Sequence, residues 1–198
     1  MSSFTPSQKV AGSRVAEKPH APRTTASIDS QSLYTTCGGE HRGRDNAKNV
    51  DGRKRHVLVD SMGLLLAVLV TAASVDDARA ARDLFARLDG QPVSRVRRVY
   101  ADSKYHNYAL YEWVGENADW ELVIVRRPEG EKGWVKLPLR WTVERTFAWL
   151  GRCRRLTKDR EKTVRSSESF IKLAMIHLMR NRLEPKGTDP AFAYHTAA

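Results

Sequence analysis

The sequence predicts an α/β domain in which strands and helices alternate within one packed unit. Its 198 residues are about the length of one domain, and 41% of them are hydrophobic, which is enough for a single core. Segments rich in β-branched residues alternate with segments whose apolar residues recur at helical spacing. The run at 64–71 is almost continuously apolar, which is typical of a strand in a sheet covered on both faces. We therefore expect a sheet flanked by helices.

The first segments of the chain differ sharply in composition. Residues 1–24 are rich in Ser, Pro, Lys and Thr and have almost no large apolar side chains, so we expect a disordered leader there. Residues 24–29, TTASID, form a short β-prone segment that ends in a carboxylate. The stretch 30–49 is polar and has no periodicity, so it is predicted to be a loop.

A β-hairpin and a helix are predicted next. Residues 53–59 and 64–71 are rich in β-branched and apolar side chains, and the intervening DSMG sequence suits a turn. Residues 76–88 are predicted to be helical, because acidic residues occupy the first turn and apolar residues follow i, i+3, i+4 spacing.

The second half of the chain continues the alternation. Strands are expected at residues 96–101 and 121–127, and helices at 107–116 and 167–183. The last residues, 184–198, are expected to be a flexible tail. One domain over residues 25–183 follows from this pattern.

The segment from Leu137 to Lys162, LPLRWTVERTFAWLGRCRRLTKDREK, is predicted to be an amphipathic helix with a carboxylate beside its buried stripe. The stripe consists of Leu139, Val143, Phe147 and Leu150. At about 100° per residue, Glu144 falls at the edge of this stripe, with Ala148 and Gly151 on the same face. A carboxylate so placed can enter a cleft. The alternative is a solvated glutamate paired with Arg140 at i, i+4.

Four stretches of the chain, taken together, resemble one protein family. They are IDSQS at 28–32, GRKRHVLVDSMGLLLAVLVTAASVDDARAARDLF at 52–85, YADSKYHN at 100–107 and the helix motif RWTVERTFAWLGRCRRLTKDRE. In this order they resemble bacterial insertion-sequence transposases of the DDE class, most nearly the insertion-sequence-five group. The resemblance covers most of residues 27–183, which makes it far more specific than any single motif.

The resemblance implies a ribonuclease-H-like mixed sheet flanked by helices, with an active site of two aspartates and a glutamate. The matching residues are Asp29, Asp102 and Glu144, which would hold two Mg²⁺ ions, with Mn²⁺ as a substitute. Mg²⁺ prefers carboxylate oxygens and keeps several waters, so these side chains and a DNA phosphate can complete its coordination. Two ions about 4 Å apart would activate the attacking water or 3′-hydroxyl and stabilise the leaving oxygen.

Each aspartate also has a purely structural interpretation. Asp29 can begin a turn, and Asp102 can cap the following helix. Asp102 nevertheless follows an apolar strand, which is where open α/β sheets carry their sites. Asp60 lies in a family-like segment too, but at a predicted hairpin turn, so the structural interpretation is favoured there.

Basic residues cluster at 140–165 and 42–56, and the net charge of +11 favours polyanions such as DNA. The predicted DNA-binding residues are Arg140, Arg152, Arg154, Arg155 and Lys158. The tyrosine that the family carries three residues before the arginine is Leu137 here, and the lysine seven residues after the glutamate is Gly151. Arg152, Arg154 and Arg155 are candidates to bind phosphate in their place. A solvated basic face is the alternative. Trp141 and Trp149 are either packing residues or platforms for an unpaired base.

Other classes of protein are not indicated. Cys37 and Cys153 are far apart and lack partner motifs, so we expect neither a zinc site nor a disulfide, which fits a reducing cytoplasm. The longest apolar run, 62–73, is shorter than the roughly 20 residues of a membrane span, and no signal peptide is evident. A cytoplasmic, nucleoid-associated protein is expected.

The predicted function is metal-dependent cleavage of DNA at insertion-sequence ends, followed by transfer of the 3′-hydroxyl to target DNA. The expected partners are terminal inverted repeats, target DNA and a second copy of the chain in a homodimer. Only 28 residues precede Asp29, so the product of an upstream reading frame is a further expected partner. Two rivals stay open: a truncated, inactive DNA-binding remnant, and a nuclease of the same fold without strand transfer.

Overall fold

The computed structural model describes residues 24–36, 38–88, 96–125 and 140–183. The strands are β1 (Thr24–Tyr34), β2 (Gly43–Asp45), β3 (Val50–Asp60), β4 (Leu65–Ala72), β5 (Val96–Ala101) and β6 (Glu121–Ile124). The helices are α1 (Asp77–Ala86), α2 (Tyr108–Asn117), α3 (Arg140–Arg152) and α4 (Val164–Leu183), with 3-10 turns η1 (Ser103–Tyr105) and η2 (Arg154–Leu156). The expected leader and tail lie almost entirely outside the described residues.

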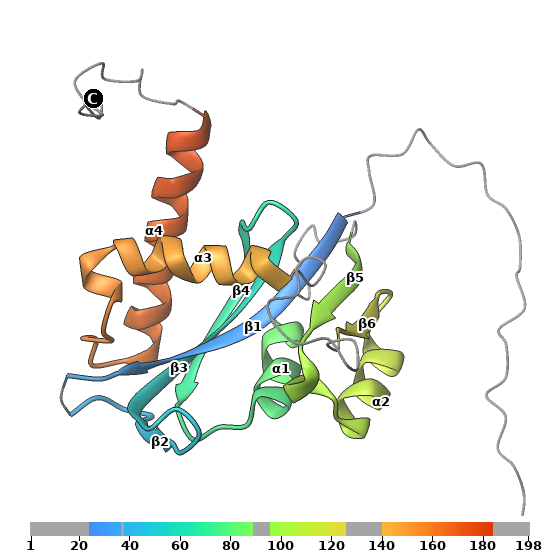
Figure 1. Ribbon diagram of the computed structural model, residues 1–198, viewed down its shortest axis with the longest axis horizontal. Helices are drawn as coiled ribbons and strands as arrows, with labels where there is room; N and C mark the ends of the chain where they lie inside the picture. Colours follow the sequence, from blue (N-terminus) through green and yellow to red (C-terminus); the bar gives the residue numbers. More distant parts are fainter. Residues whose placement is uncertain (1–23, 37, 89–95, 126–139, 184–198) are drawn as a thin grey trace, which may run out of the picture.

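The described strands form one mixed sheet (Figure 1). β3 pairs antiparallel with β1 on one side, and on its other side with β4 and, near its start, with β2. β5 runs parallel to β1, and β6 runs parallel to β5. The long strands therefore follow the order β4-β3-β1-β5-β6, three antiparallel strands continued by two parallel ones. The predicted mixed sheet is confirmed.

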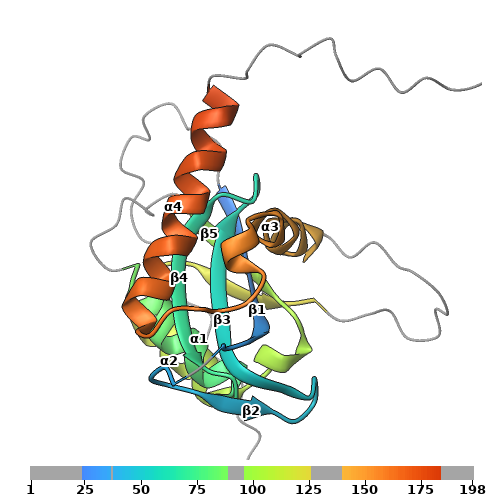
Figure 2. The ribbon, with the colours of Figure 1, turned by 90° about the vertical axis from the view of Figure 1, so that its left-hand side faces the viewer.

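Helices cover the two faces of this sheet, so the domain has three layers. α1 and α2 pack on one face against Ala26, Ile28, Leu58 and neighbouring apolar residues. α3 and α4 pack on the other face against Val57, Val59 and their neighbours (Figure 2). Because successive residues of a strand point to opposite faces, β3 contributes Leu58 to one core and the valines beside it to the other.

Two elements differ from the sequence-based expectation. β1 continues to Tyr34, although residues 30–49 were predicted to be a loop, because Ser30–Tyr34 pair with Gly52–His56 of β3. The predicted helix of residues 137–162 ends at Arg152 instead, and η2 follows it. Of its predicted buried stripe, Val143, Phe147 and Leu150 are buried, while Leu139 lies outside the described residues.

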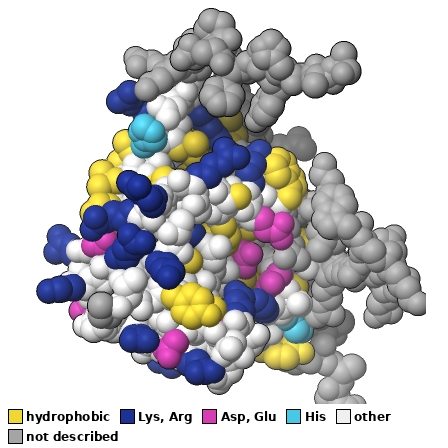
Figure 3. Space-filling model, turned by 60° about the vertical axis from the view of Figure 1, so that its left-hand side comes forward, with side chains coloured by type: hydrophobic (Ala, Val, Ile, Leu, Met, Phe, Trp, Pro, Cys, Tyr) yellow, Lys and Arg dark blue, Asp and Glu magenta, His cyan; other side chains and the backbone are white. Residues whose placement is uncertain are grey.

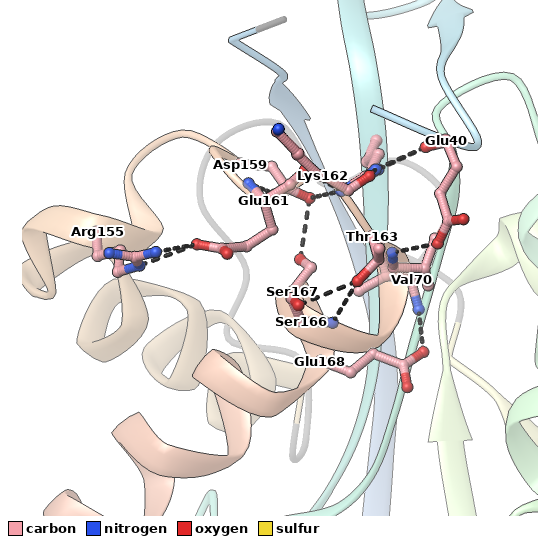
Figure 4. Close-up of polar contacts among 12 residues, drawn as sticks. Glu40, Val70, Arg155, Asp159, Glu161, Lys162, Thr163, Ser166, Ser167 and Glu168 are labelled. Carbon is pink, nitrogen blue, oxygen red and sulfur yellow. Dashed lines mark hydrogen bonds and ion pairs between the residues drawn. The ribbon is translucent and has the colours of Figure 1, made fainter. Parts of the chain in front are cut away.

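The connection after α3 leaves the helical path because buried charges anchor it to the sheet. Asp159 forms an ion pair of 3.2 Å with Arg53, and the pair is almost completely buried. The same carboxylate accepts from the Ser167 hydroxyl at 2.9 Å. Arg53 also donates to the backbone carbonyls of Glu40, Glu161 and Lys162. Figure 4 shows these loops meeting at the start of α4. Residues 159–162 are therefore held against β3 and cannot extend α3.

Polar side chains also cover the outer edge of β4. Glu168 of α4 accepts from the backbone N–H of Val70 at 3.0 Å and forms an ion pair of 2.7 Å with Arg87. Arg87 in turn donates to the carbonyl of Val68. Because an uncovered strand edge invites pairing with other chains, these contacts block such pairing at β4.

Candidate active site

Asp29 and Asp102 come from adjacent parallel strands. Ser27 of β1 is paired with Tyr100 of β5, and continuing this register by two residues places Asp29 opposite Asp102. Neighbouring strands are about 4.8 Å apart, and residues in register point to the same face. Asp29 lies on the α3 side, because it pairs with Val57 of the core beneath α3 and α4. Both carboxylates therefore belong to the sheet face that α3 covers.

The backbone orients both aspartates. The N–H of Ser30 donates to Asp29 Oδ1 at 2.7 Å. Asp102 accepts from the N–H of Lys104 at 2.9 Å and thereby caps η1. Both side chains are half-buried, so they remain accessible from solvent. Asp102 therefore does act as an N-cap, the alternative role that the sequence suggested. The cap uses only one of the two carboxylate oxygens.

Glu144 is carried by α3, which lies across β1 and β3 (Figures 1 and 2). Its neighbour Val143 is buried and Glu144 itself is exposed, so the carboxylate stands beside the buried stripe as predicted. A Cβ added at Gly151, further along the same face, would meet no atom within 4 Å. Among the described residues, the surface beside Gly151 is therefore open.

Tyr105 connects the two aspartates to the core. Its side chain is completely buried, and its hydroxyl has no hydrogen-bond partner among the described residues. Burial raises the pKa of Tyr105 well above its usual range, and the negative charges of Asp29, Asp77 and Asp102 raise it further, against a smaller opposite effect of Ser30. The charges of all three aspartates thus disfavour ionisation of the Tyr105 hydroxyl, which stays neutral.

The three predicted carboxylates are not assembled into a closed cluster. Within the described ranges, no group of three or more His, Cys, Asp or Glu side chains lies close enough to hold a metal ion. The parallel pairing of β1 and β5, extended by two residues, would set Asp29 opposite Asp102, and Glu144 stands on the helix that crosses the same face. Asp60, by contrast, accepts from the N–H groups of Met62 and Leu64 and stabilises the β3–β4 turn, as expected.

The predicted DNA-binding residues differ in their surroundings. Arg152, Arg154 and Lys158 are exposed after or at the end of α3. Arg155 is engaged, because it forms an ion pair of 2.8 Å with Glu161 and stacks on the Phe170 ring. The side chain of Arg140 lies outside the described residues. Figure 3 shows Lys and Arg side chains spread beside a group of acidic side chains on this face.

The second predicted basic cluster, at 42–56, is only partly a surface, because Arg42, Arg44 and Lys48 are exposed but the basic residues that follow are not. The consecutive side chains Arg53, Lys54, Arg55 and His56 are all buried. Burial lowers the pKa of Arg55 to about 10, with Asp159 acting in the opposite direction. These residues lie in the central strand β3, so their side chains contact other residues inside the fold.

The sequence did not indicate one contact that holds α3 in place. Arg145 lies between the rings of Trp141 and Trp149, at 4.2 and 4.8 Å, and donates to the carbonyl of Met62 at 2.9 Å. The next residue, Thr146, donates to the carbonyl of Gly63 at 2.8 Å. This clamp, formed by Arg145 and Thr146, fixes the turn that follows Glu144 against the β3–β4 hairpin. The signal for it was the placement of tryptophans four residues before and after an arginine.

Comparison with known proteins gives one family. Residues 20–179 match the family model described as Transposase DDE domain. A putative transposase for insertion sequence element IS402 from Burkholderia cepacia is 33% identical over 138 residues, which are 67% of this chain and 64% of that relative. The chain thus spans less than two thirds of the length of this relative.

Two solved structures are similar at low sequence identity. The catalytic core domain of BIV integrase has a TM-score of 0.46 at 14% identity, over 78% of this chain and 82% of that one. A piggyBac transposase synaptic complex with hairpin DNA has a TM-score of 0.43 at 13% identity, over 85% of this chain and 55% of that one. Among the described helices, none is long and apolar enough to cross a membrane.

Proposed function

Because the chain belongs to the family of DDE-domain transposases, we propose that it catalyses metal-dependent DNA cleavage and strand transfer at the ends of an insertion sequence. The observation that supports this proposal is the parallel pairing of β1 with β5. Extended by two residues, this register would set Asp29 opposite Asp102, on the sheet face that the Glu144 helix crosses. We place the element in the insertion-sequence-five group on the motifs alone.

The donor set fits a hard divalent cation. Asp29, Asp102 and Glu144 offer only carboxylate oxygens, which Mg²⁺ and Mn²⁺ prefer. Two carboxylates in register repel each other, and a cation between them removes that repulsion. Two such ions supply activation of the attacking hydroxyl and stabilisation of the leaving oxygen. The half-buried aspartates would fix one side of the site, and the exposed Glu144 would complete it when DNA is bound.

The basic residues would position the DNA. Arg152, Arg154 and Lys158 are exposed close to the end of α3, so they can contact phosphates next to the carboxylates. Such contacts are independent of sequence and weaken as salt rises. Recognition of the terminal repeats would then require a further partner, which we propose is a second copy of the chain or the product of an upstream reading frame. The proposed location is the nucleoid.

A second candidate function is a DNA-binding remnant without catalysis. It is favoured by one observation, that the described residues contain no three-carboxylate cluster of metal-binding size. Joined products separate the two candidates, and they also exclude a nuclease that cuts without transferring the strand.

The test is strand transfer of pre-cut, labelled element ends into plasmid DNA by the purified chain with Mg²⁺ or Mn²⁺. Glu144→Gln removes the proposed third ligand. Glu116→Gln, at an exposed position of α2 on the other side of the sheet, is the matched control. We expect metal-dependent joining that Glu144→Gln abolishes and Glu116→Gln preserves. Absence of joining, even after addition of the upstream product, would favour the inactive remnant.

A further inference from the structure

A buried network lies behind Asp29, on the opposite face of β1. The backbone N–H of Ser30 donates to Asp29 Oδ1, while the Ser30 side chain points to the α1 side. There its hydroxyl donates to Asp77 Oδ1 at 2.8 Å, in a fully buried contact. One residue therefore contacts the proposed metal ligand through its backbone and a buried carboxylate through its side chain.

Asp77 is itself held firmly. It is the first residue of α1, where the helix dipole favours a negative charge. Lys54 lies 3.2 Å from Asp77 Oδ1, and both side chains are less than a tenth exposed. Lys54 also donates to the carbonyl of Val75 at 2.9 Å, just before the helix. The ion pair thus joins α1 to the central strand β3.

His56 is a further residue in contact with Asp77, and it carries no positive charge at pH 7. It is opposite Ser30 in the β1–β3 register, and its Nδ1 lies 3.8 Å from Asp77 Oδ1. Its Nε2 is 3.0 Å from the Thr71 hydroxyl. Burial lowers the pKa of His56 to about 4, against the opposite effect of Asp77, so the ring is neutral at pH 7. Lys54 is then the cation that balances Asp77.

A buried ion pair is often no more stabilising than apolar residues of the same volume. Apolar residues form the core around this network, so packing alone does not require Ser30, Lys54 and Asp77. The location of this network suggests a role in positioning Asp29. Its side-chain bonds fix β1 at Ser30, the residue that follows Asp29.

We propose that Ser30 and Asp77 are positioning residues that fix the backbone at Asp29 and so orient its carboxylate toward a divalent cation. This inference rests on the proposed function, in which Asp29 is a metal ligand. Partners behind a ligand usually change metal affinity by about 10–100-fold when removed. A network that only stabilised the fold would change the melting temperature and leave metal affinity unaltered.

The chain contains a matched control for Ser30. Ser32 lies two residues further along β1, on the same face, and its hydroxyl donates to Asp45 at 2.6 Å. Ser30→Ala and Ser32→Ala therefore each remove one serine–aspartate hydrogen bond from the same strand. Only the first bond is adjacent to Asp29.

The experiment is titration of the purified chain with Mn²⁺, followed by the electron paramagnetic resonance signal of free Mn²⁺, with melting temperatures measured in parallel. Asp29→Asn defines the binding that belongs to the proposed site. We expect Ser30→Ala to raise the apparent Kd of that binding by about tenfold. Ser32→Ala should leave the Kd within about twofold and lower the melting temperature by less than Ser30→Ala does, because the Ser32–Asp45 bond is only partly buried. Asp77→Asn keeps an oxygen for Ser30 and removes the charge, so it should raise the Kd as well.

The possible failures are distinguishable. If the wild-type chain shows no Mn²⁺ binding that depends on Asp29, the proposed metal site is overturned and the positioning role falls with it. If the wild-type chain binds Mn²⁺ and neither Ser30→Ala nor Asp77→Asn changes the Kd more than Ser32→Ala does, only the positioning role is overturned. If Ser30→Ala fails to fold, the result for Asp77→Asn decides.

Discussion

Two regions of this domain use acidic side chains in opposite ways. At the anchor of the α3–α4 connection, Asp159 is buried against Arg53 and accepts from Ser167. At the candidate site, Asp29 in β1 and Asp102 just after the neighbouring strand β5 are both half-exposed. The first arrangement satisfies its charge within the protein. The second places two carboxylates near each other at the surface, where a bound cation would reduce their mutual repulsion.

Substitutions at the candidate site should have the largest effect on activity. Asp29→Asn or Asp102→Asn should reduce strand transfer by on the order of a thousandfold, because a metal ligand is lost. The melting temperature without metal should change little, because an asparagine keeps the side-chain oxygen that accepts from the N–H of Ser30 or Lys104. Strand transfer and thermal unfolding of the same preparations check both parts. A lowered melting temperature with normal activity would place Asp29 and Asp102 in the structural class.

The anchor should behave in the reverse way. Asp159→Asn leaves Arg53 buried without its counter-charge, so we expect a loss of about 3–5 kcal/mol in the free energy of unfolding. Asp51→Asn is the control, because its ion pair with Arg42 is about half-exposed. That control should change the free energy by less than about 1 kcal/mol. Urea unfolding measures both values, and equal losses would contradict the distinction between buried and exposed pairs.

The network behind Asp29 should make stability depend on pH. The pKa of His56 is lowered from 6.5 to about 4, so in this range the unfolded chain binds a proton that the folded chain excludes. The stabilisation is therefore fully present above about pH 6.5 and is lost as the pH falls toward 4. The loss should be on the order of 2 kcal/mol between the two limits. Urea unfolding of the wild type and of His56→Asn at pH 7 and pH 5 tests this, and an equal pH slope in both would contradict it.

The smallest effect is expected at the α3 clamp. Arg145→Ala removes stacking on Trp141 and Trp149 and the bond to Met62, so unfolding should become easier by about 1–2 kcal/mol. Strand transfer should fall several-fold, because the Glu144 turn is less well fixed. Arg182→Ala removes the second arginine that stacks on Trp149, together with its longer bond of 3.3 Å to the Met62 carbonyl, and leaves Trp141 untouched, so it serves as the control. An activity loss at Arg182 as large as at Arg145 would argue against a specific role in positioning Glu144.

Much of the fold was predictable because its signals are local. The β3–β4 hairpin follows from two apolar, β-branched runs around a DSMG turn, and α1 follows from an acidic first turn and helical spacing. The second half of β1 was missed because its sequence, SQSLY, alternates polar residues on both faces. Those serines point to buried carboxylates, Asp77 and Asp45, that lie far away in the sequence.

The candidate site was only partly predictable for the same reason. The position of Asp102 after an apolar strand is a local signal, and the motifs supplied Asp29 and Glu144. The burial of Arg53, Lys54 and His56 was not predictable, because a run of basic residues normally indicates a solvated surface. Their carboxylate partners come from α1 and from the connection before α4, so only the three-dimensional structure shows that the charges are balanced.

The proposed function depends most on Asp29 and Asp102 being metal ligands. A change of metal preference tests this assignment most directly. Asp102→Cys replaces a carboxylate with a thiolate, which binds Mg²⁺ poorly and softer ions better. Joining of pre-cut ends by this variant should be lost in Mg²⁺ and should recover at least about tenfold in Mn²⁺ relative to Mg²⁺. Glu116→Cys should show the metal dependence of the wild type. Equal joining by Asp102→Cys and the wild-type chain in Mg²⁺ would contradict the assignment.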